Sequence, residues 1–279
     1  MHGIFSTIAT VFTLVSAIQS VAVLVPLYTW PGTDSWQPVY DSLEAHPYTT
    51  FYLIVNPQSG PGSTEFPQNI FITAFAKLKS YSNAKLLGYV STVYGNRAIA
   101  DVEREVSVYS NWASYQGKNI AVDGIFFDEA SNGQDTTKLA YYQQVSKSAK
   151  NSNLNIVVFN PGAKIMADTP EWFAAADFIV EYENTWANWV SLAPTEHFSD
   201  MEYYHKIAIM LRGTPGVASI TDVALLATSM GLGAIYLTYD NDYMTDQSVL
   251  SVSKVAVGVD MVPPRVGVPQ PAGHRREAH

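Results

Sequence analysis

Cysteine is absent from this 279-residue sequence, and basic residues are scarce. Without thiols the chain cannot form disulfide bonds, zinc sites built on thiolates or cysteine nucleophiles. Lysine and arginine number 16 against 25 aspartates and glutamates, which gives a formal net charge of −9. A chain of this charge lacks the basic stripe that displaces counterions from phosphates, so we expect no nucleic-acid partner. A neutral or cationic partner is compatible with it.

Other signatures of enzyme chemistry are missing as well. The six histidines are nowhere paired at the spacing of metal ligands, so we expect no metal site. A G-x-S-x-G nucleophile elbow does not occur, which argues against a serine hydrolase. The first apolar run is followed by PLYTWPG rather than by a glycine-rich phosphate loop, which argues against a nucleotide-binding sheet. We therefore expect no cofactor.

Long apolar runs without charge are confined to the N-terminus. Residues 1–20 hold a mainly apolar stretch followed by small residues, and they predict a secretory signal peptide, with an uncleaved anchor as the alternative. Residues 261–279 are rich in proline and glycine without apolar periodicity, and they predict a disordered tail. Residues 21–260 then form the folded domain. We expect it to be extracellular or attached to the cell wall, monomeric, and without an Asn-x-Ser/Thr glycosylation site.

Short runs rich in Val, Ile, Leu, Phe and Tyr recur along this domain. They predict eight buried strands at 21–28, 49–57, 85–92, 124–130, 155–162, 177–184, 206–213 and 234–241. Stretches with helical periodicity lie between most of them, for example 69–81, 136–151 and 220–231, the last with Thr221 and Asp222 as N-cap candidates and Gly231 at its C-cap. This alternation predicts a single (β/α)8 TIM barrel of the α/β class, with an open doubly wound sheet as the alternative.

In such barrels the functional groups lie at the C-terminal ends of the strands. Polar residues occupy these ends in the predicted strands, and they include Tyr28, Asn56, Ser91, Thr92, Asp128, Glu129, Asn160, Glu181, Glu183, Arg212, Tyr239, Asp240 and Asn241. The fourth strand, DGIFFDEA, ends in two adjacent acids, Asp128 and Glu129, whose side chains point to opposite sides if the strand continues. We expect one of them to face the barrel lumen.

Two more acids follow each other at alternate positions of the sixth strand. Glu181 and Glu183 share one face, whereas the other face is formed by Phe178, Val180 and Tyr182. Because the outer face of a barrel strand packs on helices, we expect the apolar set to point outward and both glutamates inward. Strands two apart place their carboxyl groups about 5–9 Å from each other, an interval that covers both retaining and inverting glycosidases.

Aromatic residues follow several strands at the same end. They are Tyr28, Trp30, Trp36, Tyr94, Trp186, Trp189, Tyr239 and Tyr243. Rings gathered at one barrel mouth can stack on the apolar faces of sugars, so paired acids and aromatics together suggest a polysaccharide substrate. The candidate substrate-binding residues are Tyr28, Trp30, Asn56, Tyr94, Asn160, Trp186, Arg212, Tyr239 and Asp240. Each has an alternative structural role in a core, a loop or a helix cap, and Arg212 can equally serve to hold one acid ionised.

Several segments in order resemble the spherulin 4 family of secreted fungal and slime-mould proteins. They are VLVPLYTWPG, FYLIVNPQSGPG, DGIFFDEA, VVFNPG and FIVEYEN, and the resemblance extends from about residue 22 to 258. The spherulin 4 family includes glycoside hydrolase family 135. The resemblance therefore implies a (β/α)8 endo-α-1,4-N-acetylgalactosaminidase that acts on the cationic exopolysaccharide galactosaminogalactan. The family's acid pair then falls on Asp128 and Glu129, and its catalytic glutamate falls on Glu183.

We therefore predict that Asp128 and Glu183 are the principal carboxylates, one a general acid and the other a nucleophile or base, with Glu129 assisting. An N-acetyl group on the substrate can itself supply the nucleophile in a substrate-assisted variant. Two alternatives stay open. One is a non-catalytic glycan-binding or structural protein of the cell wall or spore, and the other is a family 114-like endo-α-1,4-polygalactosaminidase.

Overall fold

The protein is described by a computed structural model over residues 20–32, 34–166, 170–191 and 194–261. Its strands are β1 (Ala22–Leu27), β2 (Phe51–Val55), β3 (Ala84–Ser91), β4 (Gly124–Asp128), β5 (Ile156–Phe159), β6 (Phe178–Thr185), β7 (Ile207–Arg212) and β8 (Ala234–Leu237). All pair in parallel with their neighbours in sequence, and β1 also pairs with β8, so the eight strands close into a barrel. The predicted (β/α)8 architecture is confirmed, and closure of the barrel excludes the open sheet.

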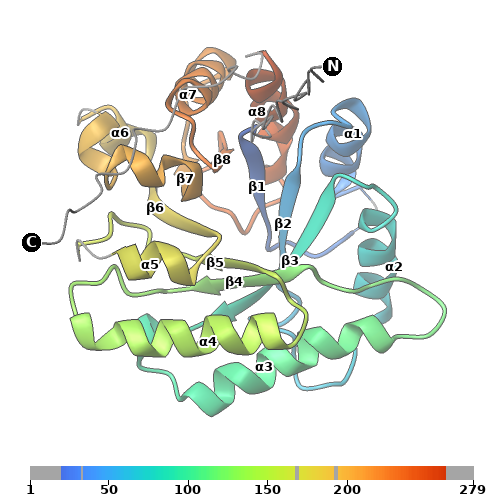
Figure 1. Ribbon diagram of the computed structural model, residues 1–279. Helices are drawn as coiled ribbons and strands as arrows, with labels where there is room; N and C mark the ends of the chain where they lie inside the picture. Colours follow the sequence, from blue (N-terminus) through green and yellow to red (C-terminus); the bar gives the residue numbers. More distant parts are fainter. Residues whose placement is uncertain (1–19, 33, 167–169, 192–193, 262–279) are drawn as a thin grey trace, which may run out of the picture.

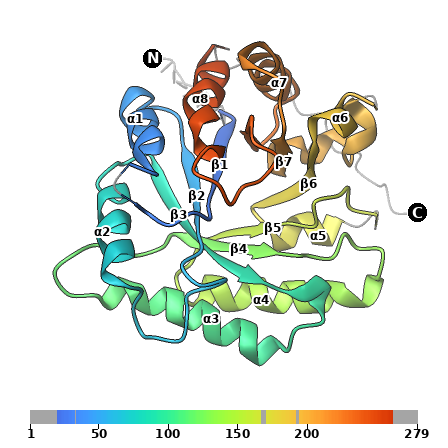
Figure 2. The ribbon, with the colours of Figure 1, turned by 180° about the vertical axis from the view of Figure 1, so that it is seen from behind.

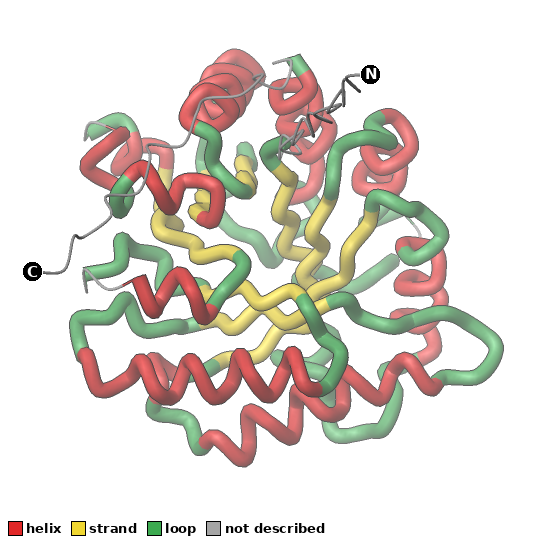
Figure 3. The backbone as a smooth tube through the Cα atoms, viewed as in Figure 1, coloured by secondary structure: helices red, strands yellow, loops and turns green. Residues whose placement is uncertain are grey.

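Helices surround the barrel, as Figures 1 and 2 show from opposite sides and Figure 3 shows by element type. They are α1 (Gln37–Ala45), α2 (Asn69–Leu78), α3 (Ile99–Asn111), α4 (Leu139–Asn151), α5 (Pro170–Ala175), α6 (Trp186–Trp189), α7 (Val217–Met230) and α8 (Val252–Asp260). The connections after β5 and β6 carry the short helices α5 and α6, of 6 and 4 residues, and the second also holds two short 3-10 helices, Pro194–His197 and Met201–Lys206. Loop segments therefore make up much of the wall beside these two strands.

The strands are buried on both faces, which explains their almost continuous apolar sequences. Every residue of β1 is buried, as expected for a strand between a filled lumen and a layer of helices. Tyr52 of β2 and Phe178 of β6 meet with their ring centroids 5.1 Å apart. Since β2 and β6 are four strands apart in a ring of eight, these two rings fill the lumen. Fully burying a large apolar side chain stabilises a fold by about 1.5–3 kcal/mol.

A bulge in β6 overturns the predicted facing of that strand. Val180 pairs with Ala208 of β7, but Tyr182 pairs with the next residue, Ile209, so Glu181 is an extra residue in the ladder. Such an insertion shifts the alternation of side chains by one. Phe178, expected to point outward, points into the lumen, and the bulge brings Glu183 back toward the barrel mouth.

Element ends differ from the predicted ones in informative ways. Helix α7 begins at Val217 rather than at the predicted caps, and Thr221 lies within its first turns, where its hydroxyl donates to the Val217 carbonyl. The predicted C-cap is confirmed, because Gly231 adopts a left-handed conformation with φ 80°. Strand β8 ends at Leu237, so Asp240 lies in the following turn.

The predicted signal peptide and tail fall almost wholly outside the described residues, so the division into 1–20, 21–260 and 261–279 remains a prediction. Within the described ranges, no helix is long and apolar enough to cross a membrane.

Candidate functional site

One amide nitrogen joins the two principal carboxylates. The Asn160 Nδ2 donates to Asp128 Oδ1 at 2.8 Å and to Glu183 Oε2 at 2.6 Å. The two bond lengths together limit the separation of these oxygens to about 5.4 Å. Strands β4, β5 and β6 thus deliver three strand-end side chains to one point, and at least one oxygen of each acid lies close to one of the other.

The orientation of the Asn160 amide follows from its other bond. Its Oδ1 accepts from the Gly162 N–H at 3.0 Å, so Nδ2 must face the two acids. Gly162 has φ 63°, and its carbonyl accepts from the Glu183 N–H at 3.1 Å. The turn after β5 therefore fixes both the amide that bridges the acids and the backbone of one of them. Asn160 is only 6% exposed, so its amide is largely shielded from solvent.

Burial raises the pKa of both acids above the ordinary carboxyl range. For Glu183 the charge of Asp128 adds to the rise, while the Asn160 hydrogen bond and the nearby Arg212 oppose it. For Asp128 burial is again the main cause, and it is opposed by hydrogen bonds from the Glu129 backbone N–H and from the Tyr89 and Asn160 side chains. Asp128 thus has three donors that favour its ionised form, whereas Glu183 has one.

Tyrosines enclose this carboxylate pair. The Tyr89 hydroxyl hydrogen-bonds to Asp128, and its ring meets Tyr28 edge-on with centroids 5.6 Å apart. Burial, followed by the charges of Asp128 and Glu183, raises the pKa of Tyr28. Tyr243, buried near Glu183, has no hydrogen-bond partner for its hydroxyl among the described residues. Nothing in the sequence pattern singles out Tyr89, which lies inside a predicted strand; its register beside β4, where it pairs with Phe126 two residues before Asp128, is the signal that identifies it.

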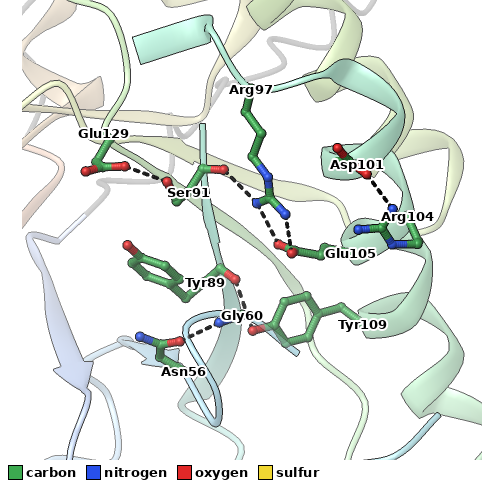
Figure 4. Close-up of polar contacts among 10 residues, drawn as sticks. All are labelled: Asn56, Gly60, Tyr89, Ser91, Arg97, Asp101, Arg104, Glu105, Tyr109 and Glu129. Carbon is green, nitrogen blue, oxygen red and sulfur yellow. Dashed lines mark hydrogen bonds and ion pairs between the residues drawn. The ribbon is translucent and has the colours of Figure 1, made fainter. Parts of the chain in front are cut away.

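Glu129 leaves the strand in a strained conformation. Its φ is 49°, in the left-handed region that side-chain-bearing residues rarely adopt. Ser91 Oγ donates to Glu129 Oε2 at 2.5 Å, and Thr92 Oγ1 donates to the Glu129 carbonyl at 2.9 Å. Ser91 is held in turn by Arg97, which donates to the Ser91 carbonyl and forms an ion pair with Glu105 (Figure 4). The end of β3 therefore holds Glu129 in place beside Asp128.

Glu181 does not join the acid cluster. Its side chain is fully buried and accepts hydrogen bonds from Ile165 N (3.0 Å), Ser199 N (2.8 Å) and Ser199 Oγ (2.5 Å). The expectation that it lies in the lumen below Glu183 is wrong, because the bulge turns it toward these loops. Burial raises its pKa, and its role is to join the segments after β5 and before β7.

The remaining candidates divide into residues near the acids and residues used elsewhere. Arg212 lies close enough to Glu183 to lower its pKa, and its buried Nε has no partner among the described residues. Asn56 and Asp240 serve their own turns: Asn56 Oδ1 accepts from Gly60 N at 2.7 Å (Figure 4), and Asp240 accepts from Thr245 and the Asn241 N–H. These three contacts give a structural explanation for both residues.

The aromatic residues divide in the same way. Trp30 is 50% exposed and Tyr94 is 56% exposed, so both offer ring surface to a ligand. Trp186 and Tyr239 are half-buried against the core. Trp36 and Trp189, which the sequence placed among the rings of the mouth, are buried in packing against Phe75 and His197, and neither can serve as an open platform.

A closed (β/α)8 barrel with acids gathered at the ends of β4 and β6 defines a protein with a glycosidase-like fold. The family model of spherulation-specific family 4, Spherulin4, matches residues 22–254, and the chain belongs to this family. The resemblance inferred from the sequence is thereby confirmed. Among the described residues, no group of three or more His, Asp or Glu side chains is arranged to hold a metal ion.

Individual relatives agree with this family. The chain is 28% identical over 228 residues to Spherulin-4 of Physarum polycephalum, a match that covers 79% of this chain and 64% of that protein. It thus spans less than two thirds of that relative's length. Aspergillus clavatus Sph3, solved in complex with GalNAc, matches with a TM-score of 0.72 and 28% identity over 86% of this chain and 98% of that chain. The endo-beta-1,4-mannanase of Thermotoga petrophila shares the fold alone, with a TM-score of 0.54 and 10% identity over 88% of this chain and 77% of that chain.

Proposed function

We propose that this protein is a secreted glycoside hydrolase that cleaves α-1,4-linked N-acetylgalactosamine in a cell-surface polysaccharide such as galactosaminogalactan. The observation that carries the proposal is the single Asn160 amide that holds Asp128 and Glu183 within about 5.4 Å of each other. Two acids at this spacing can act on opposite sides of one glycosidic bond. The likeness to Sph3, which was solved with GalNAc, supports the sugar.

The hydrogen bonds favour different roles for the two acids. Asp128, with three donors, is the better anion, and it acts as the nucleophile or orients the acetamide of the substrate in a substrate-assisted step. Glu183 is desolvated beside the charge of Asp128, which favours its protonated form, so it donates a proton to the leaving oxygen. Glu129, held by Ser91 at the rim, assists by contacting the substrate. The close approach of one oxygen of each acid is compatible with a retaining or a substrate-assisted step.

Release of reducing ends from purified galactosaminogalactan tests the proposal. The full chain would be expressed in a fungal secretion host and compared with Asp128→Asn and Glu183→Gln, both checked for folding by circular dichroism. We expect activity in the parent and a loss of at least about a hundredfold in each variant. Sequencing the N-terminus of the secreted protein would test the signal peptide in the same preparation.

Two other outcomes would replace the proposal. A parent that binds the polysaccharide without releasing reducing ends would be a glycan-binding protein of the cell wall or spore. Cleavage that is faster on de-N-acetylated polymer than on the acetylated form would identify an endo-α-1,4-polygalactosaminidase instead.

A further inference from the structure

A cleft of about 500 Å³ adjoins the acid cluster on the side of β3, β4 and β5. Its walls include Tyr94 after β3, Asn132 after β4 and Pro161 after β5. It also reaches Ala130, the neighbour of Glu129 in sequence, and Pro161 directly follows Asn160. The cleft therefore lies beside the strand ends that carry Glu129 and Asn160, and its volume lies in the usual range of small-molecule sites.

The wall that carries Tyr94 is a strained turn. Val93, Tyr94 and Gly95 have φ values of 47°, 56° and 73°, so three consecutive residues are left-handed. This conformation is unfavourable for any side chain and most unfavourable for a β-branched one such as Val93. A turn of this kind persists only where surrounding contacts impose it.

Those contacts come from the segments that follow β4. The Tyr94 N–H donates to the Glu129 carbonyl at 2.6 Å, and Lys138 Nζ donates to the Gly95 carbonyl at 3.2 Å and to Asn96 Oδ1 at 2.7 Å. Glu129 is left-handed itself, so two strained segments hold each other at the rim of the site. The result is a tyrosine ring that is 56% exposed beside the cleft.

The chemistry of the walls matches a neutral sugar. Tyr94 offers a ring face, and Asn132 and Gln134 offer amide donors and acceptors. Two of the three protons of the Lys138 ammonium are used within the turn, which leaves one for an oxygen acceptor on a ligand. Asp135 also lines the cleft: its Oδ1 accepts from the Thr137 hydroxyl and N–H, which lower the pKa of Asp135, and the nearby Lys138 ammonium lowers it further, so the two charges of the wall offset each other.

From these features we infer that the cleft is a subsite for the sugar residue next to the bond that is cleaved, with Tyr94 as its stacking platform. The inference rests on the proposed function in that it assumes a polysaccharide lying across the acids. It assigns the cleft to a neutral sugar bearing hydroxyl or acetamide oxygens, because the charges of Lys138 and Asp135 offset each other and the other polar groups of the wall are neutral amides and hydroxyls.

Binding to a catalytically disabled chain tests the subsite apart from hydrolysis. In a Glu183→Gln background, calorimetry would compare Tyr94→Ala with Tyr94→Phe as the matched control that keeps the ring. The ligands are free N-acetylgalactosamine and a defined α-1,4-linked oligosaccharide of it. We expect Tyr94→Ala to weaken oligosaccharide binding about tenfold, with Tyr94→Phe and the affinity for the free sugar each within about twofold of the background.

Lys138→Gln adds a readout of charge. It should raise the affinity for the de-N-acetylated oligosaccharide relative to the acetylated one, because it removes the ammonium that repels an amino sugar. If Tyr94→Ala fails to fold, Asn132→Ala, at another residue that lines the cleft, provides the same comparison.

Three results separate this inference from the proposed function. Oligosaccharide affinity that is unchanged in Tyr94→Ala and Asn132→Ala, in a chain whose parent is hydrolytic, overturns the subsite and leaves the function standing. A parent without hydrolysis whose oligosaccharide binding still depends on Tyr94 overturns the function and supports the subsite. An equal loss of affinity for the free sugar and the oligosaccharide overturns the assignment to the neighbouring sugar.

Discussion

Removing the shared amide by Asn160→Ala should disable the site without unfolding the barrel. The substitution deletes the donor that holds Asp128 Oδ1 and Glu183 Oε2. Hydrogen bonds to charged groups contribute about 1.5–3 kcal/mol each. Because water can enter the space and replace part of this, a net loss of about 2–4 kcal/mol is expected, which corresponds to a fall in kcat/KM of roughly 30- to 900-fold.

The pH dependence gives a sharper readout than the rate. The Asn160 hydrogen bond lowers the pKa of both Asp128 and Glu183, so its removal raises both. In the proposed roles the acid limb of the kcat/KM profile follows ionisation of Asp128, and the alkaline limb follows loss of the proton from Glu183. Both limbs should therefore move to higher pH in Asn160→Ala.

The assay is hydrolysis of the N-acetylgalactosamine polymer across pH, with thermal unfolding measured on the same samples. Asn155→Ala is the matched control, since Asn155 is exposed and precedes the opposite end of β5, and since the one hydrogen bond of its side chain within the described part of the chain goes to the Asn153 carbonyl at 3.4 Å. An Asn160→Ala enzyme with an unshifted profile and a rate within a few fold of the parent would refute the bridging role. A collapse in unfolding temperature together with the rate would mean that Asn160 is needed for the fold instead.

Three further perturbations distinguish the acids. Glu183→Gln should raise the unfolding temperature at neutral pH, by about 2–4 °C for each kcal/mol gained. The raised pKa of Glu183 favours folding below the ordinary carboxyl pKa and costs stability as pH rises through the folded value, so the gain should vanish near pH 4 in thermal melts across pH. Glu181→Ala, which removes three hydrogen bonds to Ile165 and Ser199, should instead lower the free energy of unfolding by roughly 2–4 kcal/mol in urea while kcat of the folded enzyme changes little. Ser91→Ala should lower kcat about tenfold at unchanged KM by freeing Glu129, and Ser91→Thr should retain it; an equal loss in both would contradict a hydrogen-bonding role.

The fold is predictable because the apolar runs, the helical periodicity between them and their order along the chain all indicate the same architecture. Near-continuous apolar runs such as residues 21–28 can only be buried on both faces, and eight of them alternating with helical segments close into a barrel. Element ends are less predictable. The helix at Val217 begins four residues before the expected cap, because Thr221 bonds back to a carbonyl instead of capping.

The acids of the site were predictable as strand ends, but their geometry was not. Pattern alone placed Asp128 and Glu183 at one mouth, whereas the bridge through Asn160 depends on the turn at Gly162 and on the ladder registers. The alternation of apolar and polar residues in this strand contains no sign of the bulge at Glu181. Strict alternation therefore predicted the correct facing of the Glu183 side chain but the wrong facing of Phe178 and Glu181. Tyr89 escaped notice because it has the appearance of an ordinary strand residue.

Burying acids at the barrel mouth lowers the stability of the fold. The strained backbone positions lie at the same end of the barrel as these acids. Glu129, Val93 and Tyr94 are all left-handed, and Asp128 and Glu183 both have raised pKa values, yet all five lie at the C-terminal end of the barrel. Glu181, the extra residue of the bulge, holds the adjacent loops through hydrogen bonds that its carboxylate accepts from Ile165 and Ser199. The bulge therefore turns Glu181 and Glu183, two residues apart on one strand, toward different surroundings. One keeps the loops together, and the other faces the substrate, so substitutions at these neighbouring positions should change stability in opposite directions.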